Sequence, residues 1–359
     1  MRKTTLALLF LLLLLTLSAC NGNKPTAPAA GEPTNTVPAE VVATEVPATE
    51  TPTIAATNTP EATATPAPTN TPEVVETPTE TPTPTLEATP LPEAGSTRIS
   101  EVDQMVQIYV PAGEFIMGSD DVEAQTIVGT NGRAYPEIPV NTVYLDSYWI
   151  DKYEVTNAQY LLCEAAGVCD SPYLNKSETR PSYHDNPEYA NYPVIYVNWY
   201  MAKTYCEWTG RRLLTEAEWE KASRGTDGRK YPWGNDKPTG ENANFCDTNC
   251  PRTIANHNFD DGYADTAPVG SYPAGASPYG VMDMSGNVWE WTGTIINPYP
   301  YDATDGRENT DPSLWVERVW RGGPWSNGYW WIRSTVRYRS IPSYWYVNLG
   351  FRCGQSAQP

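Results

Sequence analysis

The most distinctive stretch of the sequence begins with Arg318-Val-Trp-Arg-Gly-Gly-Pro-Trp325 and ends with Gly350-Phe-Arg-Cys353. An earlier run, Asp283-Met-Ser-Gly-Asn-Val-Trp-Glu-Trp291, also combines tryptophan, glycine and charged residues. Aromatic residues broken up by glycine, proline and asparagine are typical of short strands joined by long ordered loops. Residues 98–359 hold every Trp, Tyr and Phe except Phe10. We therefore expect one large folded domain there, with a core of its own.

The first twenty residues have the pattern of an export signal. Arg2 and Lys3 precede a leucine-rich run from Leu6 to Leu17, which is too short to span a bilayer comfortably. Small residues before Cys20 resemble the bacterial lipoprotein signal, in which that cysteine is lipidated and becomes the mature N-terminus. A plain secretory signal with an incidental cysteine is the alternative. We expect an extracytoplasmic protein, lipid-anchored to a bacterial membrane, in a compartment where disulfides persist.

Residues 21–97 have the composition of a disordered stalk. They consist largely of Thr, Pro, Ala, Glu and Val and contain no aromatic residue, so they cannot form a core. Dense proline favours an extended polyproline II chain. Ten Glu and one Lys give this segment a net charge of −9, about half of the −19 of the whole chain. The remainder is still acidic, which argues against nucleic acid as a partner.

Local signals predict three helices and several short strands in the domain. Capping residues predict that the helices open after Thr156, Asn198 and Thr215. Branched and aromatic residues predict strands at residues 105–110, 115–117, 140–145, 147–150, 315–321 and 332–339. Because residues 140–145 directly precede residues 147–150, we expect these two strands to form a hairpin.

The tryptophan-rich motifs resemble those of the formylglycine-generating enzymes, also called sulfatase-modifying factors. Further motifs of that family follow one another in family order: Val110-Pro-Ala-Gly-Glu-Phe-Ile-Met-Gly118, Tyr153-Glu-Val-Thr-Asn157, Tyr192-Pro-Val-Ile-Tyr-Val-Asn-Trp199, Arg212-Leu-Leu-Thr-Glu-Ala-Glu-Trp-Glu220 and Tyr231-Pro-Trp-Gly-Asn235. One motif alone would be a weak signal, whereas the ordered series covers essentially all of residues 98–359. The resemblance implies a complex α+β domain, related to C-type lectins, with little regular secondary structure.

That family oxidises a target cysteine with two reactive cysteines of its own. When the chain is aligned from Gly322 and Gly323, the reactive positions fall at Asn327 and Ile332. Neither side chain supplies a thiolate. We therefore expect no copper and a protein that is not an enzyme. The alternative is a formylglycine-generating oxidoreductase that acts on an exported sulfatase, because the ordered series of family motifs favours it.

An iron site is not expected either. Relatives that use iron need three histidines, and this chain has only His184 and His257. Both histidines lie in loop-like sequence, where hydrogen bonding at the surface is the commoner role.

Cysteine spacing and the family resemblance together imply three disulfides. The chain has seven cysteines, and six remain if Cys20 is lipidated. Spacing suggests two local pairs, and the resemblance implies a third pair that ties the second helix to the C-terminal strand: Cys163 with Cys169, Cys246 with Cys250, and Cys206 with Cys353. Since six cysteines allow fifteen pairings, the local pairs rest on proximity alone. A free, redox-active Cys246 and Cys250 is the alternative.

The resemblance also implies two structural calcium sites built from oxygen ligands. Calcium takes six to eight oxygens from carboxylates, amides and backbone carbonyls. The expected ligands are the side chains of Asp283 and Glu290 with the carbonyls of Gly286 and Val288, and the side chains of Asn244 and Asp261 with the carbonyls of Phe245 and Tyr263. Without the resemblance, Asp260-Asp-Gly262 would be only a turn.

In the family, the region between Gly323 and Gly350 lines the substrate groove. Here it is rich in rigid aromatic and small polar residues, which are typical of adaptable binding surfaces. We assign Trp320, Trp325 and Phe351 to the core. The expected groove residues are Asn327, Tyr329, Trp330, Trp331, Arg333, Arg337, Tyr344 and Trp345. The favoured function is a surface-anchored, non-catalytic protein that binds a peptide, a glycan or a protein.

Overall fold

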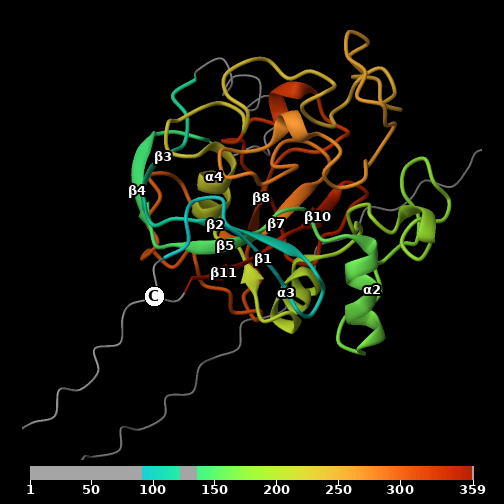
Figure 1. Ribbon diagram of the computed structural model, residues 1–359, viewed down its shortest axis with the longest axis horizontal. Helices are drawn as coiled ribbons and strands as arrows, with labels where there is room; N and C mark the ends of the chain where they lie inside the picture. The colour runs from blue at the N-terminus through green and yellow to red at the C-terminus, as the bar shows by residue number, and fades with distance from the viewer. Residues whose placement is uncertain (1–90, 122–135, 358–359) are drawn as a thin grey trace, which may run out of the picture. The chain divides into compact units, whose positions relative to one another are not determined.

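The computed structural model of the chain describes residues 91–121 and 136–357 (Figure 1). The expected signal, Cys20 and most of the expected stalk lie outside the described residues. The fold begins slightly before the expected boundary, because the Gly95 N–H already donates to the carbonyl of Tyr109 over 3.0 Å. Within the described part of the chain, every helix is too short or too polar to cross a membrane.

A five-stranded antiparallel sheet holds the last strand of the domain between two others. Its strands lie in the order β1 (Thr97–Ile99), β2 (Val106–Val110), β5 (Tyr148–Asp151), β11 (Cys353–Ser356) and β6 (Arg212–Leu213). Ile108 and Ile150 of this sheet pack with Trp219 in a buried cluster. Because β11 lies between β5 and β6, the last residues of the domain join strands from far earlier in the chain.

A four-stranded sheet contains the tryptophan-rich motifs. Its order is β10 (Leu349–Phe351), β7 (Trp289–Ile295), β8 (Arg318–Arg321) and β9 (Tyr338–Ser340), and β10 runs parallel to β7. Trp291 lies opposite Trp320, and Trp320 lies opposite Tyr338. This register places large rings on neighbouring strands, so that they build the main core together with Trp199 and Phe351.

A separate two-stranded ribbon is formed by β3 (Gly113–Met117) and β4 (Asn141–Leu145). The predicted hairpin between residues 140–145 and 147–150 is wrong, because β4 pairs with β3 while β5 pairs with β2 and β11. Figure 1 shows this ribbon at one side of the domain and the helix α2 at the opposite side. The predicted strand at 332–339 shrinks to β9, since the chain turns where the Val336 N–H donates to the carbonyl of Arg333.

The three predicted helices are confirmed. They are α2 (Asn157–Ala165), α3 (Trp199–Trp208) and α4 (Glu216–Arg224), and their caps are Thr156, Asn198 and Thr215. Short 3₁₀ turns occur at Pro187–Tyr189, Pro273–Gly275 and Tyr329–Trp331. Every residue of α4 is buried, including Glu216 and Glu220.

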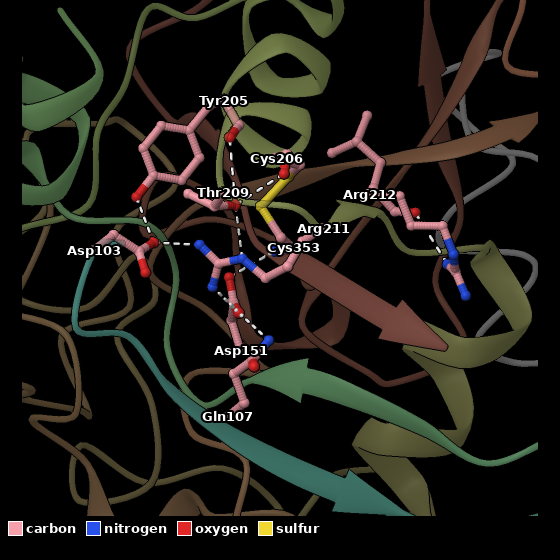
Figure 2. The surroundings of a disulfide bond; sticks show 10 residues. Asp103, Gln107, Asp151, Tyr205, Cys206, Thr209, Arg211, Arg212 and Cys353 are labelled. Atoms are coloured by element: carbon pink, nitrogen blue, oxygen red, sulfur yellow. Dashed lines mark hydrogen bonds and ion pairs between the residues drawn. A yellow bond between two sulfur atoms is a disulfide. The ribbon is translucent and has the colours of Figure 1, made fainter. Parts of the chain in front are cut away.

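Three disulfides with the predicted pairing are present, so Cys246 and Cys250 are bonded to each other and are not free thiols. The bond between Cys206 and Cys353 ties α3 to β11 (Figure 2). Beside it, the Arg211 guanidinium contacts the carboxylates of Asp103 and Asp151, and Asp151 also accepts the Cys353 N–H over 2.9 Å. A buried polar network therefore surrounds the long-range disulfide.

Candidate functional site

A cavity of about 720 Å³ opens beside the four-stranded sheet. We call it the aromatic pocket, because six rings contribute to its wall: Trp289, Trp320, Trp331, Tyr338, Tyr344 and Tyr346. The remaining wall is mostly polar and consists of Arg252, Glu317, Ser326, Asn327, Arg339, Ser340, Ile341 and Asn348. The three tryptophans are almost fully buried and form the floor, whereas the tyrosines are more exposed and form the rim.

Ring packing across β7, β8 and β9 sets the shape of the pocket. Tyr338 stacks on Trp289, with ring centroids 5.5 Å apart and planes inclined by 25°. Trp320 contacts Tyr338 at 5.3 Å and Tyr344 at 5.6 Å. Such contacts stabilise ring pairs beyond the area that they bury. The rings therefore hold one another in place without a ligand.

A glycine allows the loop after β8 to reach the pocket wall. Gly323 has φ +73°, and a Cβ atom there would lie 2.4 Å from the carbonyl oxygen of Trp331. No other residue fits this conformation and this approach without strain. The loop then delivers Ser326 and Asn327 to the wall, where Asn348 donates to the Ser326 hydroxyl over 2.7 Å.

Of the two residues that align with the family's reactive cysteines, Asn327 lines this pocket and Ile332 does not. Half-buried Asn327 is part of the wall, and its carbonyl accepts the Cys246 N–H over 2.9 Å. Ile332 is fully buried in an apolar cluster with Tyr231 and Phe245. Neither position carries a titratable side chain. Among the described residues, the pocket wall contains no cysteine.

The structure brings three of the eight predicted groove residues into the pocket: Asn327, Trp331 and Tyr344. The prediction is wrong for two arginines, which are buried in ion pairs. Arg333 binds both oxygens of Glu137 at 2.9 Å, and Arg337 binds the carboxylate of Glu216. A buried guanidinium needs such a partner, and it is then no longer available to a ligand.

The other three predicted residues lie outside the pocket wall. Trp345 stacks on Tyr173, with centroids 4.9 Å apart. Trp330 packs against the main core, and Tyr329 contacts Phe259 at 6.0 Å. Residues 344 to 346 thus alternate in direction, since Tyr344 and Tyr346 line the pocket and the residue between them does not.

Several pocket residues were missed by the sequence analysis: Arg252, Trp289, Glu317, Tyr338, Tyr346 and Asn348. The alternation of side chains in an extended segment could have grouped Tyr346 with Tyr344. Trp320 was assigned to the core, and it is both buried and part of the pocket floor. Trp325 and Phe351 are buried as expected.

The residues of one predicted calcium set come together. The oxygens of Asp261 accept the backbone N–H groups of Phe245 and Tyr263, both over 2.9 Å. Buried Asn244 Oδ1 has no hydrogen-bond partner among the described residues. Buried Asp247, which was not predicted, accepts the Asp261 N–H over 2.6 Å. Burial and the Asp247 charge raise the pKa of Asp261 to about 8. A buried amide oxygen without a partner, in the residue next to the Phe245 N–H that Asp261 accepts, fits a hard divalent cation.

In the other predicted set, Glu290 already has a cationic partner. Both of its oxygens accept hydrogen bonds from Arg352, and Trp219 donates to one of them. The predicted ligands of this set were Asp283, Gly286, Val288 and Glu290. A calcium ion there would have to share Glu290 with a guanidinium, so the geometry supports this set less than the first.

Two carboxylates that interact with Glu290 and Arg352, those of Asp283 and Glu154, keep raised pKa values. Burial raises the pKa of Asp283 to about 6, and burial together with the Asp283 charge raises the pKa of Glu154 well above its usual value. Buried Asn287 donates to Glu154 over 3.2 Å, while Glu154 Oε1 has no partner among the described residues. No three His, Cys, Asp or Glu side chains form a metal-binding group in residues 91–121 and 136–357. Calcium at either set would therefore depend on amide and carbonyl oxygens as well.

Residues 93–357 match the sulfatase-modifying factor enzyme 1-like domain, and the chain belongs to this family. The formylglycine-generating enzyme of Streptomyces coelicolor is 32% identical over 299 residues, which cover 70% of this chain and 89% of that protein. The inactive C-alpha-formylglycine-generating enzyme 2 of Mus musculus is 30% identical over 301 residues, which cover 72% of this chain and 89% of that protein.

The serine/threonine-protein kinase pkn1 of Chlamydia caviae is 32% identical over 267 residues. The match covers 70% of this chain and 38% of the kinase, so this chain spans well under half of that relative. Among solved structures, PvdO from Pseudomonas aeruginosa has a TM-score of 0.57 and 27% identity, with 74% of this chain and 100% of PvdO covered. Treponema denticola variable protein 1 has a TM-score of 0.51 at 20% identity, over 73% of this chain and 99% of that protein. These likenesses confirm the α+β fold with little regular secondary structure.

Proposed function

We propose that this protein is a binding protein that uses the aromatic pocket and does not generate formylglycine. The observation that carries the proposal is the replacement of both reactive cysteines. Asn327 stands in the pocket wall, Ile332 is buried, and the six cysteines of the described residues are all in disulfides. The thiolate is the nucleophile and soft-metal ligand of cysteine chemistry, and a disulfide sulfur cannot replace it.

The pocket has the properties of a ligand site. A volume of about 720 Å³ falls within the range of roughly 300 to 1,000 Å³ that is usual for small-ligand pockets. Its rim of tyrosines combines large contact areas with hydroxyl groups, and aromatic residues are the commonest energetic anchors of interfaces. A peptide, a glycan or a segment of a partner protein would fit these properties.

We infer further that Cys20 carries a lipid and that residues 21–97 hold the domain away from a bacterial membrane. The leucine-rich run before Cys20 and the proline-rich composition support this. We also propose a structural calcium ion at Asn244, Phe245, Asp261 and Tyr263, and a second one at Asp283, Gly286, Val288 and Glu290. The unpartnered Asn244 oxygen and the raised pKa of Asp261 support the first ion.

An array of glycans and peptides, probed with the soluble protein, tests the proposal. Tyr344→Ala should weaken every genuine hit at least tenfold, because it removes a half-buried ring from the pocket wall. Trp331 is less suitable, since a buried tryptophan costs about 3 to 5 kcal/mol of stability when truncated.

Tyr144→Ala is the matched control. Tyr144 lies on β4, outside the pocket wall, and is 62% exposed. Hits that respond equally to both variants, or to neither, would place the binding surface elsewhere and contradict the proposal.

The alternative function is a formylglycine-generating oxidoreductase. The likeness to the Streptomyces coelicolor enzyme over most of its length favours it. It would require a nucleophile other than cysteine at the pocket, and Asn327 and Ser326 are the polar side chains that the loop after β8 places there. The Ser326 side chain forms hydrogen bonds with Asn327 and Asn348. Neither of these partners is a base that could activate a nucleophile.

A further inference from the structure

The charges of the aromatic pocket are neutralised within the protein. Glu317 and Arg339 form an ion pair of 3.1 Å. Arg252 pairs with Glu178 at 3.0 Å, and its guanidinium lies over the ring of Trp325. Arg252, Glu317 and Arg339 are the charged side chains of the pocket wall. Each charge of the wall thus already has an opposite charge beside it, and this local balance favours a ligand without net charge.

The neutral part of the wall combines flat rings with hydroxyl and amide groups. Tyr344 and Tyr346 are stacked, with centroids 6.0 Å apart and planes inclined by 26°, and Tyr346 is 44% exposed. Ser326, Asn327 and Ser340 lie in the same wall. A sugar ring has an apolar C–H face that packs on an aromatic ring, and its hydroxyl edge both donates to and accepts from such side chains.

A second cavity, of about 250 Å³, is lined in part by Tyr173, Asn198 and Thr204. Trp345 points away from the aromatic pocket and stacks on Tyr173, with planes inclined by 15°. Tyr173 is 49% exposed, lines the second cavity and accepts a hydrogen bond of 3.0 Å from Asn198. Two residues of the aromatic segment 344 to 346 therefore line the pocket, and the third packs against a ring that lines the second cavity.

The second cavity also combines aromatic rings with hydrogen-bonding groups. Its wall contains the hydroxyls of Ser171 and Thr204, the amide of Asn198 and the carboxylate of Asp170. A carboxylate accepts hydrogen bonds from sugar hydroxyls and repels an anionic ligand. The Tyr173 ring, supported from one side by Trp345, provides a platform for a second ring.

We propose that the ligand is a neutral oligosaccharide, with one sugar ring in the aromatic pocket and a neighbouring part of the chain on Tyr173. This inference rests on the proposed function and specifies its ligand. A chain of similar rings suits two cavities that both combine aromatic rings with hydrogen-bonding groups, and occupying both with one ligand raises the total affinity.

Calorimetric titration with chito-, cello- and malto-oligosaccharides of one to five rings tests the inference. We expect affinity for at least one series to rise with chain length. Tyr173→Ala should weaken the longer members at least tenfold and the single sugar less than twofold, while Tyr344→Ala should weaken all members. Affinity should change less than twofold between 50 mM and 500 mM salt, because the ligand carries no charge. Tyr144→Ala serves as the control that leaves binding unchanged.

The outcomes separate the inference from the proposed function. One outcome is that peptides bind, that Tyr344→Ala abolishes this binding, and that no sugar series binds. It would overturn the oligosaccharide proposal and leave the proposed binding function intact. Equal effects of Tyr173→Ala on short and long sugars would overturn the role of the second cavity. The absence of any ligand that depends on Tyr344 would overturn both.

Discussion

Arg352 binds both carboxylate oxygens of Glu290: its Nε lies 2.7 Å from Oε2, and its Nη2 lies 2.8 Å from Oε1. Both side chains are buried. Glu290 belongs to β7 of the four-stranded sheet, and Arg352 directly precedes β11 of the five-stranded sheet. The pair therefore fastens the two sheets to each other at their cores.

Breaking this pair should be costly. Arg352→Met leaves a buried carboxylate without its partner, and the free energy of unfolding should fall by about 3 to 5 kcal/mol in urea titrations. The double variant Arg352→Met/Glu290→Leu should lose less than Arg352→Met alone. Arg229→Met, which breaks a more exposed pair with Asp227, should cost less than about 1 kcal/mol. Equal losses for the two arginines would show that the buried pair has no special role.

Calcium should stabilise the protein. An ion that binds only the native state adds about 2.7 kcal/mol at a hundredfold excess over its Kd, which corresponds to a rise in Tm of about 5 to 10 °C. Chelation with EGTA should reverse this rise in the wild type. The response should be smaller in Asp261→Ala and in Asn244→Ala, and unchanged in the exposed control Asp236→Asn. A Tm that changes neither with calcium nor with EGTA would contradict the proposed metal sites.

Glu308 should make stability fall as the pH rises. Burial raises the pKa of Glu308, whereas hydrogen bonds from Tyr301 and Thr294 lower it. Burial is the larger effect, and the pKa rises from 4.5 to about 7. Between these two values the unfolded chain has lost the proton and the folded protein still holds it. The folded state therefore binds more protons, and the contribution of Glu308 declines by about 3 kcal/mol from pH 4.5 to pH 7. Glu308→Gln should show a flatter urea-unfolding profile across this range, and parallel profiles would contradict the assignment.

The disulfide between Cys206 and Cys353 should contribute more than the local ones. It closes a loop with a sequence separation of 147, whereas Cys163 and Cys169 are separated by 6. The chain-entropy model gives about 5 kcal/mol for the long loop and about 2 kcal/mol for the short one. Paired substitution by serine, followed by urea unfolding, measures both. A larger loss for the local pair would show that native-state packing, and not loop closure, sets the difference.

Local features of the fold were predictable from the sequence. Thr156, Asn198 and Thr215 mark their helices because capping depends only on residues within one turn. The hairpin between residues 140–145 and 147–150 was not predictable in this way. Strand pairing depends on partners such as β11 that lie far away in the chain, and alternation alone does not identify them.

The candidate site was predictable in location and only partly in composition. The family alignment placed Asn327 at the site, and it lines the pocket. The buried state of Arg333 and Arg337 depends on Glu137 and Glu216, which lie 196 and 121 residues away. The role of Trp289 depends on the register that brings Tyr338 beside it. Such long-range relationships leave no mark in the local sequence.

The most direct test of the central claim is a search for the aldehyde product. The protein is incubated with copper, oxygen and a Cys-x-Pro-x-Arg peptide, and formylglycine is measured by mass spectrometry, with the Streptomyces coelicolor enzyme as the positive control. Because Asn327 and Ile332 occupy the reactive positions, we predict no aldehyde above the protein-free blank. Repeated turnover above that blank would contradict the account and establish an enzyme that works without the family's cysteine pair.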